Sequence, residues 1–228
     1  LHGWTLQFSD DFKGPQGQLP SSALWQFDLG HGYSKLGGNW GTHEVEANTA
    51  QPENVSLDGG GHLRIVPLRD VQGAWTSARI ETRRSDFVAP VGGVLRMEAR
   101  IRMPEVHGAA ALGYWPAFWA LGRSFRTQHD WPASGEVDVM ENINGLDRVW
   151  GTLHCGVSPG GPCNEKHGLS ADAPCPGSTC QANFHVYTVE WDRRVSPQVL
   201  RWYVDGRSYH TLRETDDLTP LEACQVAV

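Results

Sequence analysis

The feature of this sequence that most constrains its fold is an apolar side chain at every second position. Successive side chains of a β-strand point to opposite faces, so this period predicts strands with one face in a core. In one such run the apolar members are Leu95, Met97, Ala99, Ile101 and Met103. Residues 4–8 and 78–83 repeat the pattern, and no segment sustains the helical period of about 3.6 residues.

Turn residues separate these runs. Residues 58–61, Asp-Gly-Gly-Gly, lie between the runs 54–57 and 62–66, and Asp-Gly at 205–206 precedes a return of the chain through 207–212. The 26 Gly and 14 Pro suit a protein of many short strands. We therefore predict an all-β fold, an antiparallel β-sandwich or barrel. We find no internal repeat and no linker, so residues 1–228 are expected to form a single domain.

The charge of the chain argues against several partners. The net charge is −7, the pI is about 5.8, and Lys and Arg form no cluster, so we expect no nucleic acid and no membrane as a partner. No apolar run approaches the roughly 18 residues of a membrane span, and the first residues lack the regions of a signal peptide. The sequence as given predicts a soluble domain.

Four of the five cysteines fall in one Gly- and Pro-rich segment: Cys155, Cys163, Cys175 and Cys180. Cross-links there would rigidify a long loop, so we interpret these residues as disulfide-forming and the protein as secreted. A structural zinc site is the alternative, but the spacings are poor for zinc. Cys224 is left over. Asn54-Val-Ser matches the acceptor tripeptide for N-glycosylation.

The stretch SGEVDVMEN, residues 134–142, places three carboxylates among apolar side chains. In a regular strand Glu136 and Asp138 share a face, whereas Glu141 has the opposite parity and would enter the core. An unpaired buried carboxylate is costly, and a β-bulge at residues 139–140 would turn Glu141 to the polar face. We therefore predict such a bulge, with the outer carboxyl groups near the separation of about 5–5.5 Å found in retaining glycosidases.

Three acids serve separable steps of glycoside hydrolysis. One carboxylate attacks the anomeric carbon, and a second carboxyl group protonates the leaving sugar and later deprotonates water. Crowding of like charges raises the pKa of at least one group, so Asp138, between the other two, can share a proton. The alternative is three solvated acids on an exposed strand, against which the apolar side chains between them argue.

With its extra residue, GEVDVMEN closely resembles the same motif of glycoside hydrolase family 16, in its laminarinase-like branch. The resemblance is also carried by YWPAFWALG at 114–122, TSARIETR at 76–83, GTLH at 151–154, and FHVYTVEWD with LRWYVDG at 184–206. It implies a concanavalin A-like jelly roll with a concave substrate cleft, and retaining endo-hydrolysis of β-1,3- or mixed-linkage β-glucans without a required cofactor. By this match Glu136 is the nucleophile, Asp138 the assisting acid and Glu141 the acid/base. HCGVSPGGPCNE looks most like fungal members.

Ten Trp are many for 228 residues, and sugar rings pack on aromatic side chains. Trp115 and Trp119 are four residues apart and share a face of a regular strand, and Trp131 lies five residues before Glu136. We predict that these three contact the substrate, with core packing as the alternative for each. The tryptophans that follow apolar alternation are expected in the core: Trp4, Trp191 and Trp202.

The resemblance implies further substrate contacts. Arg79 matches an Arg that hydrogen-bonds sugar hydroxyls, and His154 matches a histidine of the cleft, with a structural histidine as the alternative. Asn39, Trp40 and Glu44 resemble a loop that contacts sugars toward the non-reducing end, although residues 42–43 are Thr-His where relatives commonly carry Asn-Asn. The remaining histidines are expected at the surface.

The end of the chain departs from the family pattern. In relatives the WYVDG turn precedes a long segment with an inner strand and a last strand, whereas only 22 residues follow Gly206 here. We expect the domain to lack C-terminal strands usual in the family because the chain is a fragment, with Cys224 paired to the remainder; a different closure of the sandwich is the alternative. Some relatives bind calcium with residues from both termini, so a structural calcium is open.

Two other functions stay open. A non-catalytic, lectin-like glucan-binding protein is one, and the presence of both Glu136 and Glu141 argues against it. A transglycosylase is the other, and it shares the glycosyl-enzyme intermediate with a hydrolase. In each case the expected partner is a β-glucan polysaccharide. A monomer is the default expectation, because the sequence does not determine the oligomeric state.

Overall fold

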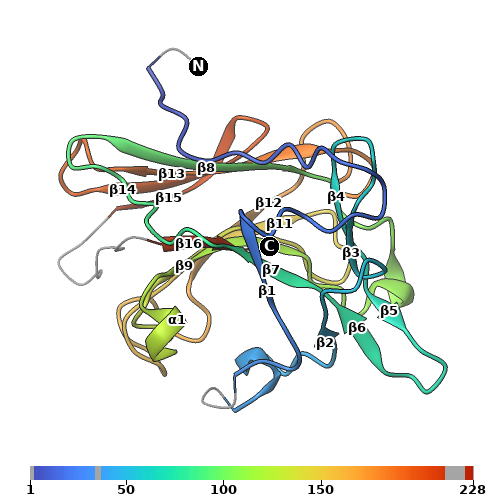
Figure 1. The fold of residues 1–228 in the computed structure, drawn as a ribbon. Coiled ribbons are helices and arrows are strands. Elements are labelled where there is room, and N and C mark those ends of the chain that lie inside the picture. The colour runs from blue at the N-terminus through green and yellow to red at the C-terminus, as the bar shows by residue number, and fades with distance from the viewer. Residues whose placement is uncertain (1–2, 34–36, 214–223, 228) are drawn as a thin grey trace. The chain divides into compact units, whose positions relative to one another are not determined.

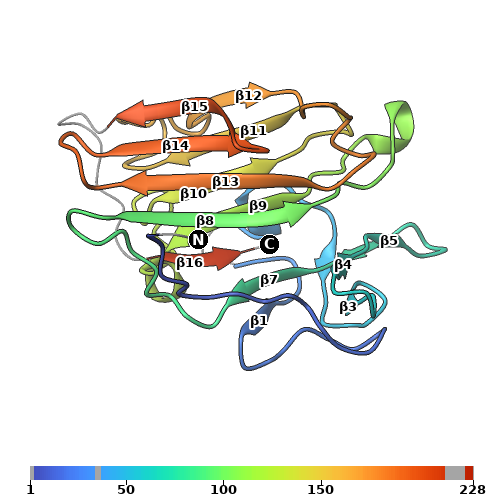
Figure 2. The ribbon, with the colours of Figure 1, turned by 90° about the horizontal axis from the view of Figure 1, so that it is seen from above.

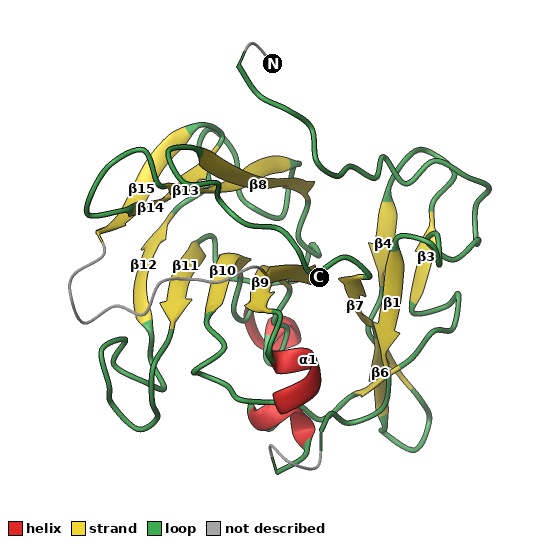
Figure 3. Ribbon diagram, turned by 60° about the vertical axis from the view of Figure 1, so that its left-hand side comes forward, coloured by secondary structure: helices red, strands yellow, loops and turns green. Residues whose placement is uncertain are grey.

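The computed structural model describes residues 3–33, 37–213 and 224–227. The chain forms two compact units, Leu1–Arg83 and Arg84–Val228, and each is described by itself. Strands dominate both units (Figure 3). Within the described residues, helix is limited to α1 (Phe125–Gln128) and to the 3₁₀ turns Asn39–Gly41 and Gly108–Ala111. The all-β prediction is therefore confirmed.

In the second unit two layers of antiparallel strands pack on each other (Figure 1). The first layer is the four-stranded sheet β15-β14-β13-β8, whose strands lie side by side in Figure 2. Its strands are β8 (Val94–Ile101), β13 (His185–Asp192), β14 (Val199–Val204) and β15 (Arg207–Arg213). The second layer has the order β16-β9-β10-β11-β12. Its strands are β9 (Ala117–Gly122), β10 (Glu136–Glu141), β11 (Val149–His154), β12 (Leu169–Ala173) and β16 (Cys224–Ala227).

Apolar side chains fill the space between these layers. Val137 and Val139 of β10 are each 1% exposed, and Tyr187 and Val189 of β13 are fully buried. Burying a side chain of this kind contributes roughly 1.5–3 kcal/mol. Trp202 of β14 is also fully buried. The apolar side chains that alternate with polar ones along the sequence are thus the side chains that form this core.

The first unit consists of short strands. β1 (Trp25–Asp28) pairs antiparallel with β7 (Arg79–Thr82). A second sheet has the order β2-β6-β5, in which β2 and β6 are parallel. Its strands are β2 (Ala47–Asn48), β5 (Leu68–Arg69) and β6 (Trp75–Ser77). The hairpin predicted around residues 58–61 is confirmed as β3 (Val55–Leu57) and β4 (Leu63–Ile65).

The strand predicted over residues 4–8 is wrong. These residues are irregular, Trp4 is 39% exposed and Leu6 is 72% exposed. Alternation forms a strand only where a neighbouring strand supplies hydrogen bonds, and the described pairings give this segment none. Trp191 and Trp202 lie in the core as predicted.

The residues after Gly206 supply two strands. β15 completes the second predicted hairpin with β14, and β16 pairs with β9 from Cys224 opposite Gly122 to Ala227 opposite Trp119. The last described residues therefore supply a strand of the second layer. The prediction for the partner of Cys224 concerns a side chain that lies outside the described part.

The cysteine prediction is confirmed by two disulfides, Cys155–Cys163 and Cys175–Cys180, so the zinc alternative is wrong. The glycosylation prediction is also wrong, because Asn54 is 3% exposed and its amide nitrogen donates to Val66 O and Thr76 Oγ1. Among the described helices, none is long and apolar enough to cross a membrane.

Candidate active site

The β-bulge predicted in β10 is present. Against β11, Asp138 pairs with Thr152 and Glu141 pairs with Trp150. Residues 139 and 140 therefore share the single partner position of Gly151, which is the pattern of a bulge. The register with β9 also shifts, between residues 138 and 140. The extra residue reverses the parity of Glu141, and its charge acts on both other carboxyl groups.

Gly151 and Trp202 fit the bulge from the side of the core. A Cβ on Gly151 would overlap Cδ1 of Trp202 and lie 2.5 Å from the hydroxyl oxygen of Tyr209. The missing Cβ lets the indole pack against Gly151 and donate from Nε1 to the backbone oxygen of Asp138 at 2.8 Å. Since a bulge interrupts the ladder, this bond gives the Asp138 carbonyl a partner.

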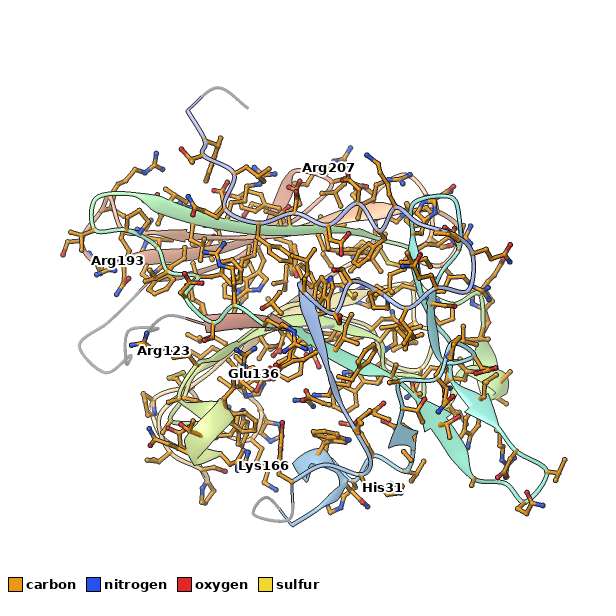
Figure 4. The ribbon with its side chains drawn as sticks, in the orientation of Figure 1. His31, Arg123, Glu136, Lys166, Arg193 and Arg207 are labelled. Carbon is orange, nitrogen blue, oxygen red and sulfur yellow. A yellow bond between two sulfur atoms is a disulfide. The ribbon has the colours of Figure 1, made fainter. Side chains whose placement is uncertain are left out.

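Each outer carboxylate accepts a hydrogen bond from an indole. Nε1 of Trp131 donates to Oε2 of Glu136 at 2.7 Å, and Nε1 of Trp115 donates to Oε1 of Glu141 at 2.7 Å. Trp115 is 51% exposed, so its ring is open to a ligand. Figure 4 shows Glu136 on the side of its layer that faces away from β13 and β14. The carboxylates are therefore held on the face that can meet a substrate.

His154 lies opposite Glu136 on β11 and connects the carboxylates to a buried acid. Its Nε2 is 3.4 Å from Oδ2 of Asp138, and its Nδ1 is 2.8 Å from Oε2 of Glu165. The Glu165 side chain is 0% exposed, and its other oxygen accepts a hydrogen bond from the Cys155 N–H at 2.8 Å. Oδ2 of Asp138 has no hydrogen-bond partner in the described part of the chain.

Burial is the first cause of the pKa shifts of all three carboxyl groups. It raises the pKa of Glu136 well above its ordinary value, and the charge of Asp138 adds to this. It raises the pKa of Asp138 in the same way, followed by the charge of Glu141. It also raises the pKa of Glu141, against which the hydrogen bond from Trp115 and the charge of His154 act. Crowded buried carboxyl groups of this kind share protons near neutral pH.

In the first unit, Arg79 and Trp40 form one cluster. The Arg79 guanidinium lies 4.3 Å from the ring centroid of Trp40, and its Nε donates to Oδ2 of Asp28 at 3.1 Å. The Tyr33 hydroxyl donates to the other oxygen of Asp28 at 3.3 Å, and its ring meets Trp40 edge-on. Trp40 is 7% exposed. Arg79 is thereby fixed by Asp28 and Trp40, and Tyr33 contacts both of these side chains.

Asn39 and Glu44 lie in the loop around this cluster. Asn39 and Trp40 have φ of 48° and 53°, a left-handed backbone that side chains other than glycine adopt at a cost. Thr42 Oγ1 donates to Oε1 of Glu44 at 2.6 Å. Burial and a hydrogen bond with Glu46 raise the pKa of Glu44 to about 7. The loop therefore holds a carboxyl group that titrates near neutral pH.

The second unit brings together most of the predicted site residues: Glu136, Asp138, Glu141, Trp115, Trp131 and His154. Trp119 joins them as the cross-strand partner of Asp138 on β9. The other four, Arg79, Asn39, Trp40 and Glu44, belong to the first unit. Sequence reasoning missed Glu165, although it ends the quoted HCGVSPGGPCNE, because an irregular loop has no period to interpret. It also missed Asp28, which binds Arg79.

The described residues contain no group of three His, Cys, Asp or Glu side chains placed to hold an ion. The possible calcium site would use residues from both termini. Residues 1–2, 214–223 and 228 lie outside the described part of the chain.

Known proteins match this chain along most of its length. A family model described as "XgeA-like, catalytic GH16 domain" matches residues 101–184. The solved endo-1,3-β-glucanase of Streptomyces sioyaensis is 51% identical with a TM-score of 0.96, over 100% of this chain and 84% of that one. The laminarinase catalytic domain of Thermotoga maritima is 26% identical with a TM-score of 0.75, over 98% and 85% of the two chains.

Among curated proteins, the β-glucanase of Rhodothermus marinus is 32% identical over 91% of this chain and 65% of its own length. This chain thus spans less than two thirds of that relative. The three organisms are bacteria, so these matches do not bear on the likeness to fungal members.

A β-sandwich with carboxylates gathered on a bulged strand, beside the exposed indole of Trp115 and the half-buried indole of Trp131, defines a protein of the glycoside hydrolase class. The chain belongs to glycoside hydrolase family 16, as the family model over residues 101–184 and the 51% identity to the Streptomyces sioyaensis endo-1,3-β-glucanase over its whole length together show. The jelly-roll sandwich implied by the sequence is the fold of that structure.

Proposed function

We propose that this chain is the catalytic domain of a retaining endo-β-1,3-glucanase. The observation that carries the proposal is the bulge at residues 139–140, which places Glu136, Asp138 and Glu141 on one face. The name of the Streptomyces sioyaensis relative supports β-1,3-glucan as substrate. Mixed-linkage β-1,3/1,4-glucan is the second substrate that we expect, because the two polymers share the β-1,3 bond.

Glu136 is the proposed nucleophile and Glu141 the proposed acid/base. The Glu136 carboxylate attacks the anomeric carbon while the Glu141 proton passes to the leaving oxygen, so that the glycosidic bond breaks and a glycosyl ester forms. Glu141 then takes a proton from water as the water oxygen attacks the same carbon. The ester bond breaks, Glu136 regains its charge, and the product leaves with its original β configuration.

Asp138 is the proposed assisting acid. It is hydrogen-bonded to Glu136 and lies beside His154. A proton on Asp138 neutralises one of the two adjacent charges, which allows Glu136 to be ionised in the free enzyme. When Glu136 becomes an ester, Asp138 can release this proton, since the neighbouring charge has gone.

The remaining predicted residues are proposed as substrate contacts. Trp115, Trp119 and Trp131 offer rings to sugar faces, and His154 lies at the carboxylates. In the first unit, Arg79 is proposed to donate to sugar hydroxyls, with Trp40 fixing its guanidinium. Asn39 and Glu44 are proposed contacts of the adjoining loop. Removal of Arg79, Asn39 or Glu44 should raise KM more than it lowers kcat.

We also propose that the protein is secreted and acts as a monomer on an external polysaccharide. The two disulfides support an oxidising compartment. Size-exclusion chromatography coupled to light scattering tests the monomer, for which the chain mass is 25.2 kDa.

The decisive experiment is incubation of the protein with laminarin, lichenan, xyloglucan and agarose, followed by chromatography of the products. We expect shorter oligosaccharides from laminarin first, then from lichenan, and none from the other two. Products longer than the starting oligosaccharide would identify a transglycosylase. Binding to laminarin without any product would identify a glucan-binding protein and overturn the proposal.

A further inference from the structure

We propose that Glu165 is a positioning residue for the hydrolysis: it fixes the tautomer of His154, and through His154 it controls the proton shared by Asp138 and Glu136. The inference rests on the proposed function. Glu165 itself contacts neither the substrate face nor the other carboxylates, because its side chain is 0% exposed and is bound by His154 and the Cys155 N–H.

The loop that carries Glu165 is built to hold it. Residues 155–163 are closed by the Cys155–Cys163 disulfide, and Gly160 and Glu165 exchange two backbone hydrogen bonds across the loop. A buried carboxylate is tolerated only where charged or strong donors meet both of its oxygens. Here the two donors are the Cys155 backbone N–H and the His154 imidazole N–H. This part of the loop therefore holds Glu165 against His154.

The hydrogen-bonding inventory fixes the ring tautomer. An ionised carboxylate only accepts, so the 2.8 Å contact from Nδ1 of His154 to Glu165 requires a proton on Nδ1. In a neutral ring Nε2 then carries a lone pair, which would face Oδ2 of Asp138 at 3.4 Å. Two lone pairs repel, so a proton must lie on Asp138 or on Nε2. By fixing this tautomer, Glu165 requires a proton between Nε2 of His154 and Oδ2 of Asp138.

The titratable groups that act on this ring come from two elements. Glu136, Asp138 and Glu141 belong to β10, and Glu165 belongs to the loop after β11. Next to β12, Gly168 packs on the ring without a side chain, since a Cβ there would lie 2.8 Å from Cε1 of His154. A positive charge on His154 lowers the pKa of both Glu136 and Glu141. The Glu165 carboxylate lies 2.8 Å from Nδ1 of this ring.

Glu165→Gln is the test variant. It keeps the shape of the side chain and changes both the tautomer of His154 and the negative charge beside its ring. The Cys155 N–H can only donate, so the new amide oxygen must face it and the amide NH₂ must face Nδ1 of His154. Nδ1 then becomes an acceptor, and the ring proton moves to Nε2, toward Asp138. The negative charge beside the ring is also lost.

For kinetics we expect kcat on laminarin to fall about tenfold to a hundredfold in Glu165→Gln with KM nearly unchanged. The acidic limb of kcat/KM should move to higher pH, because Glu136 must be ionised and the His154 charge, which lowers the pKa of Glu136, is no longer paired with a carboxylate. In a His154→Gln background the same substitution should move the limb much less, because only the direct effect of the Glu165 charge on Asp138 remains. An equal shift in that background would show that Glu165 does not act through His154.

Nitrogen NMR of the His154 ring gives a readout that does not depend on activity. At a pH where the ring is neutral, the wild-type spectrum should show Nδ1 protonated, and the Glu165→Gln spectrum should show Nε2 protonated. An Nε2-protonated wild-type ring would overturn the inference even if the enzyme degrades laminarin. Loss of the proposed function would appear separately, as a wild-type protein without activity on any β-glucan.

Asp205→Asn is the matched control. One oxygen of Asp205 accepts from the Val186 N–H at 2.8 Å, and the other lies 2.7 Å from Nδ1 of the buried His185. This pair repeats the two hydrogen bonds of Glu165 with His154, with an Asp205 side chain that is 34% exposed, and it corrects the expectation that His185 lies at the surface. The control should lose some thermal stability without moving the pH profile. A pH shift of equal size in both variants would reduce Glu165 to a structural role.

Discussion

Each carboxylate of β10 has its own hydrogen-bonding environment, and this difference divides the proposed roles. Glu136 and Glu141 accept from indole N–H groups, which stabilise the ionised forms, whereas Oδ2 of Asp138 has no hydrogen-bond donor in the described structure. The sequence predicted Trp115 and Trp131 as sugar contacts. It could not show that their polar edges bind the carboxylates, because residue spacing gives the face of a strand and not the direction of a ring.

Glu136→Gln and Glu141→Gln should each lower kcat/KM on laminarin by at least about 10³-fold, because each removes a group that forms or breaks a bond. Thermal unfolding should change little, since an amide still accepts from the indoles. Glu53→Gln changes an exposed carboxylate in the same way and should leave kcat/KM unaltered. Wild-type rates in either site variant would contradict the assigned roles.

Asp138→Asn should retain more activity than either variant and move the acidic limb of kcat/KM to lower pH. Activity is lost as the pH falls through the pKa of Glu136, because the nucleophile must be ionised. Where the shared proton lies on Glu136, Asp138 is charged and raises that pKa, and asparagine removes this charge. The measurement is kcat/KM from about pH 4 to 8, a range that brackets ordinary and raised carboxyl pKa values. A limb that stays in place would mean that Asp138 does not tune Glu136.

At the scale of one element, the bulge in β10 could be predicted from the sequence. Glu136 and Asp138 share one parity and Glu141 has the other, so β10 either buries the charge of Glu141 or contains an inserted residue. The inserted residue is observed. The supports of the bulge were not predictable. Gly151 and Trp202 lie on different strands, and their contact depends on how the two layers pack.

Gly151→Ala should therefore disturb the bulge. Its Cβ would overlap Trp202, which must move and loosen the bond to Asp138 O. Overpacking of this kind costs about 1–3 kcal/mol, measured by urea unfolding, and kcat should fall with it. The control is Gly60→Ala, where the new Cβ would meet nothing closer than 3.4 Å. A Gly151→Ala protein with wild-type stability and kcat would remove Trp202 from the support of the site.

For the molecule as a whole, alternation was sufficient to predict the class of fold, because it is imposed by the core between sheets. It failed at residues 4–8, where Trp4 and Leu6 alternate without forming a strand. It was silent on residues 155–168, where a disulfide and a backbone bridge place Glu165 behind His154. A periodic pattern predicts strands, because their side chains alternate between two faces. The loops that complete the site have no such period, so the pattern does not predict them.

The stereochemistry of the product tests the arrangement of the whole catalytic face. If the bulge leaves Glu136 and Glu141 at about 5–5.5 Å, no water fits between the sugar and the nucleophile, and two successive inversions at the anomeric carbon restore the β configuration. Proton NMR of laminarin during cleavage, recorded before mutarotation, should show the β-anomer signal growing first. The α-anomer appearing first would require the separation of about 6.5–9.5 Å found in inverting enzymes. That result would remove the nucleophile role of Glu136 while leaving the fold and the bulge as they are.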